Sequence, residues 1–230
     1  MMKITDNIAG DFMNRNNDRQ ESLKPESGNS VMSQNRMPAG MPADTIASPD
    51  PALQFVFAMF AILTWLSKIL NLTADARFVM GVLQLSLGVA ALTGSRLNLK
   101  RGDPHGNINL VLSVILGFAS GLTQISGVFA SMAHLHFHPW VLSVILLMGG
   151  IYMLAMLPLM NRAPAYVWFE HLSVSLGFLS GAFGDLLAQP VLSHISGWLL
   201  FCFALLALYQ GVSEMYGLYG RKLPQGRSLF

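Results

Sequence analysis

The chain has 230 residues, of which 53% are hydrophobic and only 11% are charged. Soluble domains carry about 25% charged residues, so this composition excludes an ordinary soluble enzyme, whose surface must be compatible with water. The formal net charge is +2, and no basic face remains outside short loops. This argues against a nucleic-acid-binding protein.

Residues 1–50 differ sharply from the rest of the chain. They hold twelve of the 26 charged residues and are rich in Asn, Asp, Ser, Pro and Gly. Such a segment cannot bury enough apolar surface to offset the entropy lost when it becomes ordered. We therefore expect a disordered tail over residues 1–50.

Six apolar segments follow, each close to the roughly 20 residues that cross a bilayer as a helix. Transmembrane strands need only about 9–11 residues, and helices satisfy their own backbone hydrogen bonds in lipid. The expected fold class is all-α, a polytopic membrane protein with six transmembrane helices over residues 51–220 and a C-terminal tail over residues 221–230. The segments are 52–71, 78–95, 107–130, 139–160, 165–187 and 191–216.

Basic residues near the segment ends are strongly biased to one side. With six crossings, eight Lys or Arg residues flank one side of the bilayer, and only Lys68 and Arg77 flank the other. Basic residues are enriched in cytoplasmic loops. We therefore expect a multi-pass protein of the cell membrane, with both tails in the cytoplasm.

Three histidines alternate in the loop between the third and fourth segments, at His134, His136 and His138. An extended loop would place all three on one side, where imidazoles can bind Zn or Cu or sense pH. No Cys or carboxylate accompanies them locally. A polar loop is the favoured interpretation, and we expect neither a metal site nor a cofactor.

Ionisable residues are rare beyond the tail, and an intramembrane charge marks a candidate functional site. Glu170, Asp185 and His194 lie in or near the fifth and sixth segments. Solvation at the membrane interface is one interpretation of these residues, and proton coupling is the other. The sequence contains no phosphate-binding Gly loop, nucleophile elbow or His-Glu-x-x-His motif, so we predict no catalytic residue and no enzyme.

Two pairs of glycines are spaced four residues apart, Gly117/Gly121 in the third segment and Gly177/Gly181 in the fifth. Small residues at this spacing let membrane helices approach closely. The pattern predicts close helix packing, either within one protomer or between protomers.

Several short motifs resemble those of the acetate uptake transporter family, which includes the succinate–acetate permease and its fungal relatives. The resemblance covers roughly residues 48–226. The matching motifs are the basic Gly-containing run 99–106, Gly184-Asp185 and His194 before Gly197-Trp198, then 207–209, Glu214 and 219–224. The run 48–54, Ser-Pro-Asp-Pro-Ala-Leu-Gln, keeps only the two prolines of the family's Asn-Pro-Ala-Pro-Leu-Gly-Leu signature.

The resemblance implies a six-helix carrier of small carboxylates such as acetate or succinate that assembles as a homo-oligomer. It also implies that the pathway narrows at Phe57, Ser113 and Val174, where Ser113 replaces an aromatic residue and Val174 a Leu. In a narrow pore, hydroxyls and amides offset part of the dehydration cost, and Ser173 and Gln124 are further candidates for this role. Each Ser could instead bond to its own helix backbone.

Two other functions stay open. A transport-inactive membrane scaffold or sensor on the same fold would explain the altered signature. A membrane enzyme that uses the His134–His138 cluster is the second alternative.

Overall fold

A computed structural model describes residues 47–138, 140–160, 163–221, 223–224 and 226. The chain divides into two units, Met1–Arg36 and Met37–Phe230, and every described residue belongs to the second. The predicted tail over residues 1–50 lies outside the described residues up to residue 46, and most of the predicted tail over residues 221–230 does so too.

All regular secondary structure of the described residues is helical, and it falls into six helical segments that match the six predicted ones. The third segment is a composite of α4, the π-helix η2 and α5, and the fourth continues from α6 into the 3₁₀ turn η3. The elements are α2 Asp50–Ile69, α3 Ala74–Lys100, α4 His105–Leu112, η2 Ser113–Ala119, α5 Ser120–Met132, α6 Trp140–Met156, η3 Leu157–Met160, α7 Ala165–Leu186 and α8 Pro190–Leu218.

Five of the six segments are long and apolar enough to cross a membrane, and among the described residues α7 is the long helix that does not meet this standard. The 22 residues of α7 would reach across a bilayer. Glu170, His171 and Asp185 lower its hydropathy. Glu170 and His171 lie on the buried face of α7 and are covered by neighbouring helices, whereas Asp185 is exposed.

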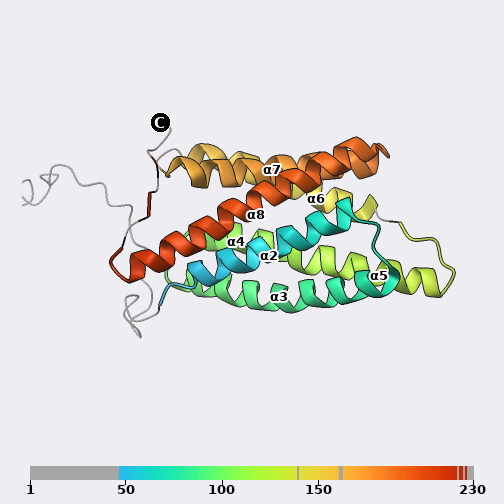
Figure 1. Cartoon of the computed structure of the whole chain (residues 1–230), viewed down its shortest axis with the longest axis horizontal. Helices are drawn as coiled ribbons and strands as arrows, with labels where there is room; N and C mark the ends of the chain where they lie inside the picture. The colour runs from blue at the N-terminus through green and yellow to red at the C-terminus, as the bar shows by residue number, and fades with distance from the viewer. Residues whose placement is uncertain (1–46, 139, 161–162, 222, 225, 227–230) are drawn as a thin grey trace, which may run out of the picture. The chain divides into compact units, whose positions relative to one another are not determined.

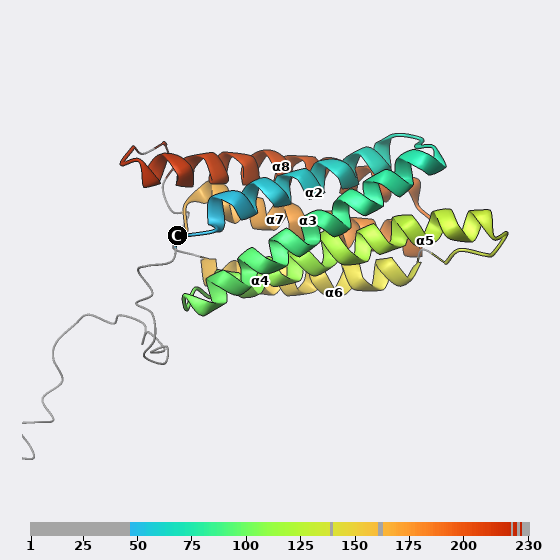
Figure 2. The same cartoon turned by 90° about the horizontal axis from the view of Figure 1, so that it is seen from below.

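The helices run antiparallel to their neighbours in sequence (Figures 1 and 2). The connections α2–α3, α5–α6 and α7–α8 meet at one end of the bundle, and the connections α3–α4 and α6–α7 meet at the other (Figure 1). In space α2 packs along α8, α8 along α7, and α7 along α6, while α3 packs against the α4–η2–α5 segment.

Local sequence signals fix several helix ends. Pro51 and Pro190 lie in the first turns of α2 and α8, where the missing N–H costs no hydrogen bond. The glycines Gly102 and Gly220 adopt positive φ angles of 78° and 71° directly after α3 and α8. They close these helices as glycine caps, since Cβ-bearing residues avoid this conformation.

The predicted glycine pairs pack within the chain. A Cβ added to Gly121 would lie 2.8 Å from the carbonyl oxygen of Gly81 in α3. A Cβ added to Gly181 would lie 2.7 Å from Ser196 Oγ in α8. The two motifs therefore hold α5 against α3 and α7 against α8. These two glycine faces pack within one protomer and not between protomers.

Candidate functional site

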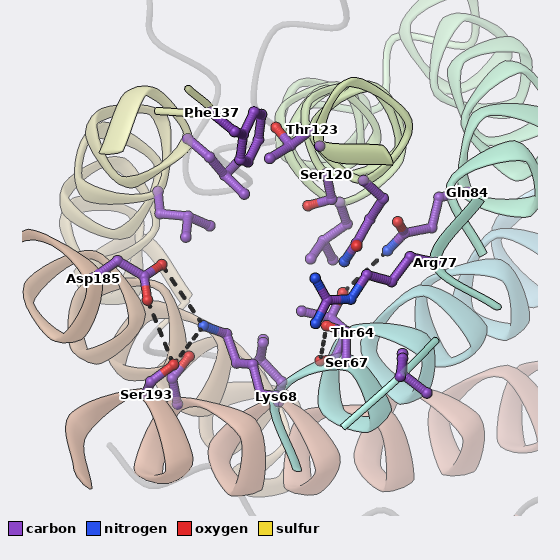
Figure 3. Close-up of a pocket in the computed structure, with 18 of the residues that line it drawn as sticks. Thr64, Ser67, Lys68, Arg77, Gln84, Ser120, Thr123, Phe137, Asp185 and Ser193 are labelled. Atoms are coloured by element: carbon purple, nitrogen blue, oxygen red, sulfur yellow. Dashed lines mark hydrogen bonds and ion pairs between the residues drawn. The ribbon is translucent and has the colours of Figure 1, made fainter. Parts of the chain in front are cut away.

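A cavity of about 710 Å³ opens at the end of the bundle where α2–α3, α5–α6 and α7–α8 connect. Every long segment contributes to its wall, so the cavity lies within the bundle (Figure 3). Its polar lining consists of hydroxyl, amide and charged groups from Thr64, Ser67, Lys68, Arg77, Gln84, Ser120, Thr123, Gln124, Ser131, Asp185, Ser193 and Ser196.

A hydrogen-bonded pair connects α2 and α3 in the cavity wall. Gln84 Nε2 donates to Thr64 Oγ1 at 3.3 Å, and Thr64 Oγ1 donates to the Phe60 carbonyl at 2.9 Å. Gln84 Oε1 has no hydrogen-bond partner among the described residues. This amide therefore keeps an acceptor for a hydroxyl or a protonated group inside the cavity.

Two cations and one anion face the cavity among its lining residues. Figure 3 shows Arg77 and Asp185 reaching into it from opposite sides, with Lys68 between them. Lys68 Nζ lies 3.9 Å from Asp185 Oδ2. The lining thus carries one excess positive charge, which favours an anion. The sequence analysis counted Lys68 and Arg77 only as basic residues near the segment ends, where such side chains commonly reach the membrane interface.

The inner end of the cavity is apolar. Leu116, Phe178 and Leu200 line it and also belong to the buried core that contains Phe57 and Val174. Phe57 and Val174 are both completely buried, and neither lines the cavity. The apolar part of the lining is therefore continuous with the packed core to which two of the predicted constriction residues belong.

Ser113 is also completely buried, so it does not face lipid. Its hydroxyl donates to the Asn109 carbonyl at 2.6 Å and lies 3.4 Å from Ser95 Oγ of α3. The hydrogen bond from a Ser hydroxyl to its own helix backbone, one of the two alternatives for each Ser, is therefore present at Ser113. Ser175 makes the same kind of bond, to the His171 carbonyl at 2.7 Å.

The other predicted polar pathway residues are placed differently from one another. Gln124 lines the cavity, whereas Ser173 is half-buried on α7 and is not part of the lining. The structure thus brings Gln124 together with the charged residues of the cavity and leaves Ser173 apart from them.

The candidates for proton coupling do not form one cluster. Glu170 and Asp185 are fifteen residues apart on α7, which separates them by about 22 Å along the helix. Glu170 is 1% exposed, and its Oε2 has no hydrogen-bond partner among the described residues. Asp185 is ion-paired in the cavity wall, and His194 is exposed.

Polar side chains also cluster at the opposite end of the bundle. Asn98 Nδ2 donates to Asp50 Oδ1, which ties α3 to the start of α2. In the α3–α4 connection, Asp103 Oδ1 accepts the backbone N–H of His105 at 2.9 Å and lies 2.9 Å from its Nδ1. The hydrogen bond with the His105 side chain lowers the pKa of Asp103 below its usual value, against the opposing effect of partial burial.

His134, His136 and His138 are exposed in the α5–α6 connection. In the part of the chain that the structure describes, no three His, Cys, Asp or Glu side chains are placed to hold a metal ion together. The loop thus offers no observation in favour of the membrane-enzyme alternative.

Comparison with known proteins gives a structural match. No protein-family profile and no curated protein matches the sequence. The fold is similar to that in "Structure of the bacterial acetate channel SatP", with a TM-score of 0.66 and 22% sequence identity over 79% of this chain and 99% of that chain. This shared fold and the five helices long and apolar enough to cross a membrane support a multi-pass membrane protein, whose described residues have the helical architecture of that channel.

Proposed function

We propose that this chain is a membrane channel or transporter for a small carboxylate such as acetate or succinate. The observation that carries the proposal is the cavity, in which Lys68 and Arg77 outnumber Asp185 and which hydroxyl, amide and apolar side chains also line. An anion that enters this cavity is attracted by the excess positive charge of the lining. Hydrogen-bond donors of the wall replace part of its hydration shell.

The apolar inner end of the cavity supplies selectivity in this proposal. An ion that passes Leu116 and Phe178 must lose water, and the cost of that loss grows with charge and falls as the pore widens. In the proposed pathway, Phe57, Ser113 and Val174 follow these residues and form the narrowest part. Their complete burial corresponds to a closed pathway, which opens when the helices or the aromatic rings move.

Proton coupling through Glu170 belongs to the same proposal. Glu170 is buried on α7 and has an unpartnered carboxylate oxygen, and a residue of this kind in a membrane marks a proton or ion pathway by default. Glu170→Gln is expected to abolish uptake driven by a pH gradient and to preserve exchange of labelled for unlabelled acetate. Retention of gradient-driven uptake in this variant would argue against coupling at Glu170.

The decisive test is flux through the purified full chain in liposomes. Labelled acetate and succinate should enter faster than in protein-free liposomes, and labelled glycerol, which is similar in size and uncharged, serves as the matched control. Equal rates with and without protein for both carboxylates would reject transport.

The alternative is a scaffold or sensor that keeps the fold without transport. The packed core residues between the cavity and the opposite end of the bundle favour this alternative. If the core never opens, the cavity can bind a ligand but cannot pass it across the membrane. Acetate binding without flux in the liposome assay would select this alternative.

We also propose that the protein forms a homo-oligomer. The glycine pairs 117/121 and 177/181 are used within the chain, so contacts between copies must use other faces. A monomeric mass in mild detergent and in nanodiscs would contradict the assembly.

A further inference from the structure

Lys68 lies at the junction of three helices. Its ammonium group, on the last turn of α2, donates to Ser193 Oγ of α8 at 3.2 Å and lies 3.9 Å from Asp185 Oδ2 of α7. Ser193 Oγ in turn lies 3.5 Å from Asp185 Oδ1, to which it donates. Figure 3 shows this triangle on one side of the cavity. Lys68 and Ser193 therefore form a two-donor site that a carboxylate occupies.

Two glycines of neighbouring helices lie beside the Lys68 side chain. A Cβ on Gly197 of α8 would lie 3.4 Å from Lys68 Cβ, and a Cβ on Gly181 of α7 would lie 3.5 Å from Lys68 Nζ. The stem of Lys68 thus crosses two glycines, and its side chain is only 13% exposed. This packing fixes the ammonium group at the cavity wall instead of leaving it to extend into water.

The ion pair with Asp185 leaves N–H donors of Lys68 unused. An ammonium group has three N–H donors, and charge-assisted N–H···O bonds are about 2.7–2.9 Å long. The 3.9 Å separation of Lys68 Nζ from Asp185 Oδ2 is longer than such a bond. A freely diffusing carboxylate can approach Lys68 more closely than Asp185, whose position is set by the backbone of α7.

We propose that Asp185 is an internal stand-in for the substrate carboxylate: it occupies the site formed by Lys68 and Ser193 when the cavity is empty, and the incoming carboxylate displaces it. This inference rests on the proposed carboxylate function. Asp185 keeps Lys68 paired in the empty state, since a buried charge without a partner is strongly unfavourable. Arg77, on the opposite side of the cavity (Figure 3), gives the mobile ligand a second cation.

A competing internal ligand lowers the apparent affinity for the external one. The apparent Kd equals the intrinsic Kd divided by the fraction of protein whose site is free. If Asp185 holds Lys68 about nine-tenths of the time, its removal strengthens acetate binding by about tenfold. Asp185→Asn removes the charge at nearly constant shape, and Asp185→Ser is a second variant should the first fail to fold.

The test measures acetate and succinate binding by calorimetry on the purified full chain, with sodium chloride at matched ionic strength as the blank. Asp185→Asn should lower the Kd for acetate several-fold, and Lys68→Gln should raise it or abolish binding. The double variant Lys68→Gln/Asp185→Asn should behave as Lys68→Gln alone, because Asp185 acts through Lys68.

Asp75→Asn is the matched control. Asp75 is exposed in the first turn of α3, at the same end of the bundle, and it does not line the cavity. Its removal changes the net charge by the same amount, and the Kd for acetate should stay the same. An equal gain in affinity from Asp75→Asn and Asp185→Asn would show a general electrostatic effect and overturn the proposal.

Other outcomes separate this inference from the proposed function. Unchanged or weaker acetate binding in folded Asp185→Asn and Asp185→Ser would overturn the displacement. Tighter binding in these variants together with zero flux in liposomes would reject transport and leave the displacement standing. Absence of acetate and succinate binding in all variants would reject the site itself.

Discussion

Gly117 in η2 and Gly88 in α3 lie backbone against backbone. A Cβ added to Gly117 would lie 2.7 Å from Gly88 Cα, a distance at which one helix must move. Overpacking of this kind costs about 1–3 kcal/mol. Gly117→Ala should therefore lower the melting temperature of the detergent-purified protein, as measured by the intrinsic fluorescence of its tryptophans.

Gly217→Ala is the control for this prediction. Gly217 lies near the end of α8, and a Cβ there would meet nothing within 4 Å. Ala is the better helix former by up to about 1 kcal/mol, so this variant should melt at the same temperature as the wild type or slightly above it. Equal melting temperatures of Gly117→Ala and Gly217→Ala would show that the α3–η2 contact can accommodate a methyl group.

Ser113→Tyr tests the proposed constriction. Ser113 is completely buried between α4–η2 and Ser95 of α3, so a Tyr ring there must occupy space in the interior. If Ser113 lines the pathway, the variant should lose flux of succinate more than flux of acetate, because a narrower pore removes more water from the more strongly hydrated ion.

Ser113→Ala accompanies this test, because it removes the hydroxyl without adding volume and should keep the wild-type flux ratio. Phe57→Ala should raise flux and reduce selectivity. Truncation of a buried Phe costs about 3–5 kcal/mol, so only protein that elutes as a single folded species is informative. A folded Ser113→Tyr protein with the wild-type ratio of acetate to succinate flux would remove Ser113 from the pathway.

Asp103 makes stability depend on pH at the α3–α4 connection. Its pKa is lower in the folded protein than in the unfolded chain because of the hydrogen bond with His105. The stability from Asp103 is fully present above the unfolded-state pKa of about 3.9 and is lost as the pH falls through the lower folded-state pKa.

Asp103→Asn should therefore melt below the wild type at neutral pH, and the difference should shrink in strongly acidic buffer. The interaction is partly exposed, so the difference at neutral pH should not exceed the roughly 1 kcal/mol typical of a helix cap. A difference that grows on acidification would assign the stabilisation to another group.

The membrane orientation is testable by cysteine labelling once Cys202, the single cysteine of the sequence, has been replaced by Ser. Ala133 and Tyr219 are exposed at opposite ends of the bundle. The charge bias predicts that an impermeant reagent labels Ala133→Cys on intact cells and labels Tyr219→Cys only after permeabilisation. The reverse pattern would place the two tails outside the cell.

Length and composition were sufficient to predict the helices. The six predicted segments agree with the six helical segments to within a few residues at most ends, because long apolar runs have few alternatives in lipid. The polar α7 was predicted as readily as the others, since its Phe, Leu and Val residues outnumber Glu170, His171 and Asp185. As a whole, α7 is less apolar than the other segments because Glu170 and His171 lie on its buried face. Average hydropathy cannot tell whether a polar residue faces the protein interior or the lipid.

The cavity was harder to predict, because it depends on which side chains from distant helices meet. Lys68 and Asp185 are 117 residues apart, and neither carries a local motif. The sequence analysis singled out Asp185 and Gln124, but it counted Lys68 only as a basic residue near a segment end and gave no role to Gln84 or Thr64. These residues become visible as a group only when α2, α3, α5 and α7 are packed together.

The π-helix η2 has a consequence for how the third segment could evolve. A π-helix carries extra residues per turn, and Ser120 Oγ bonds to the Ile115 carbonyl five residues earlier. The seven residues of η2 therefore hold about one residue more than an α-helix that winds equally far. Loss of one residue within η2 would return the segment to α-helical geometry and keep Ser120, Thr123 and Gln124 on the cavity wall. Loss of one residue from α4, which has no such surplus, would rotate these three side chains by about 100° relative to the start of the segment. The third segment could thus lose one codon at η2 and keep its polar wall, but not at α4.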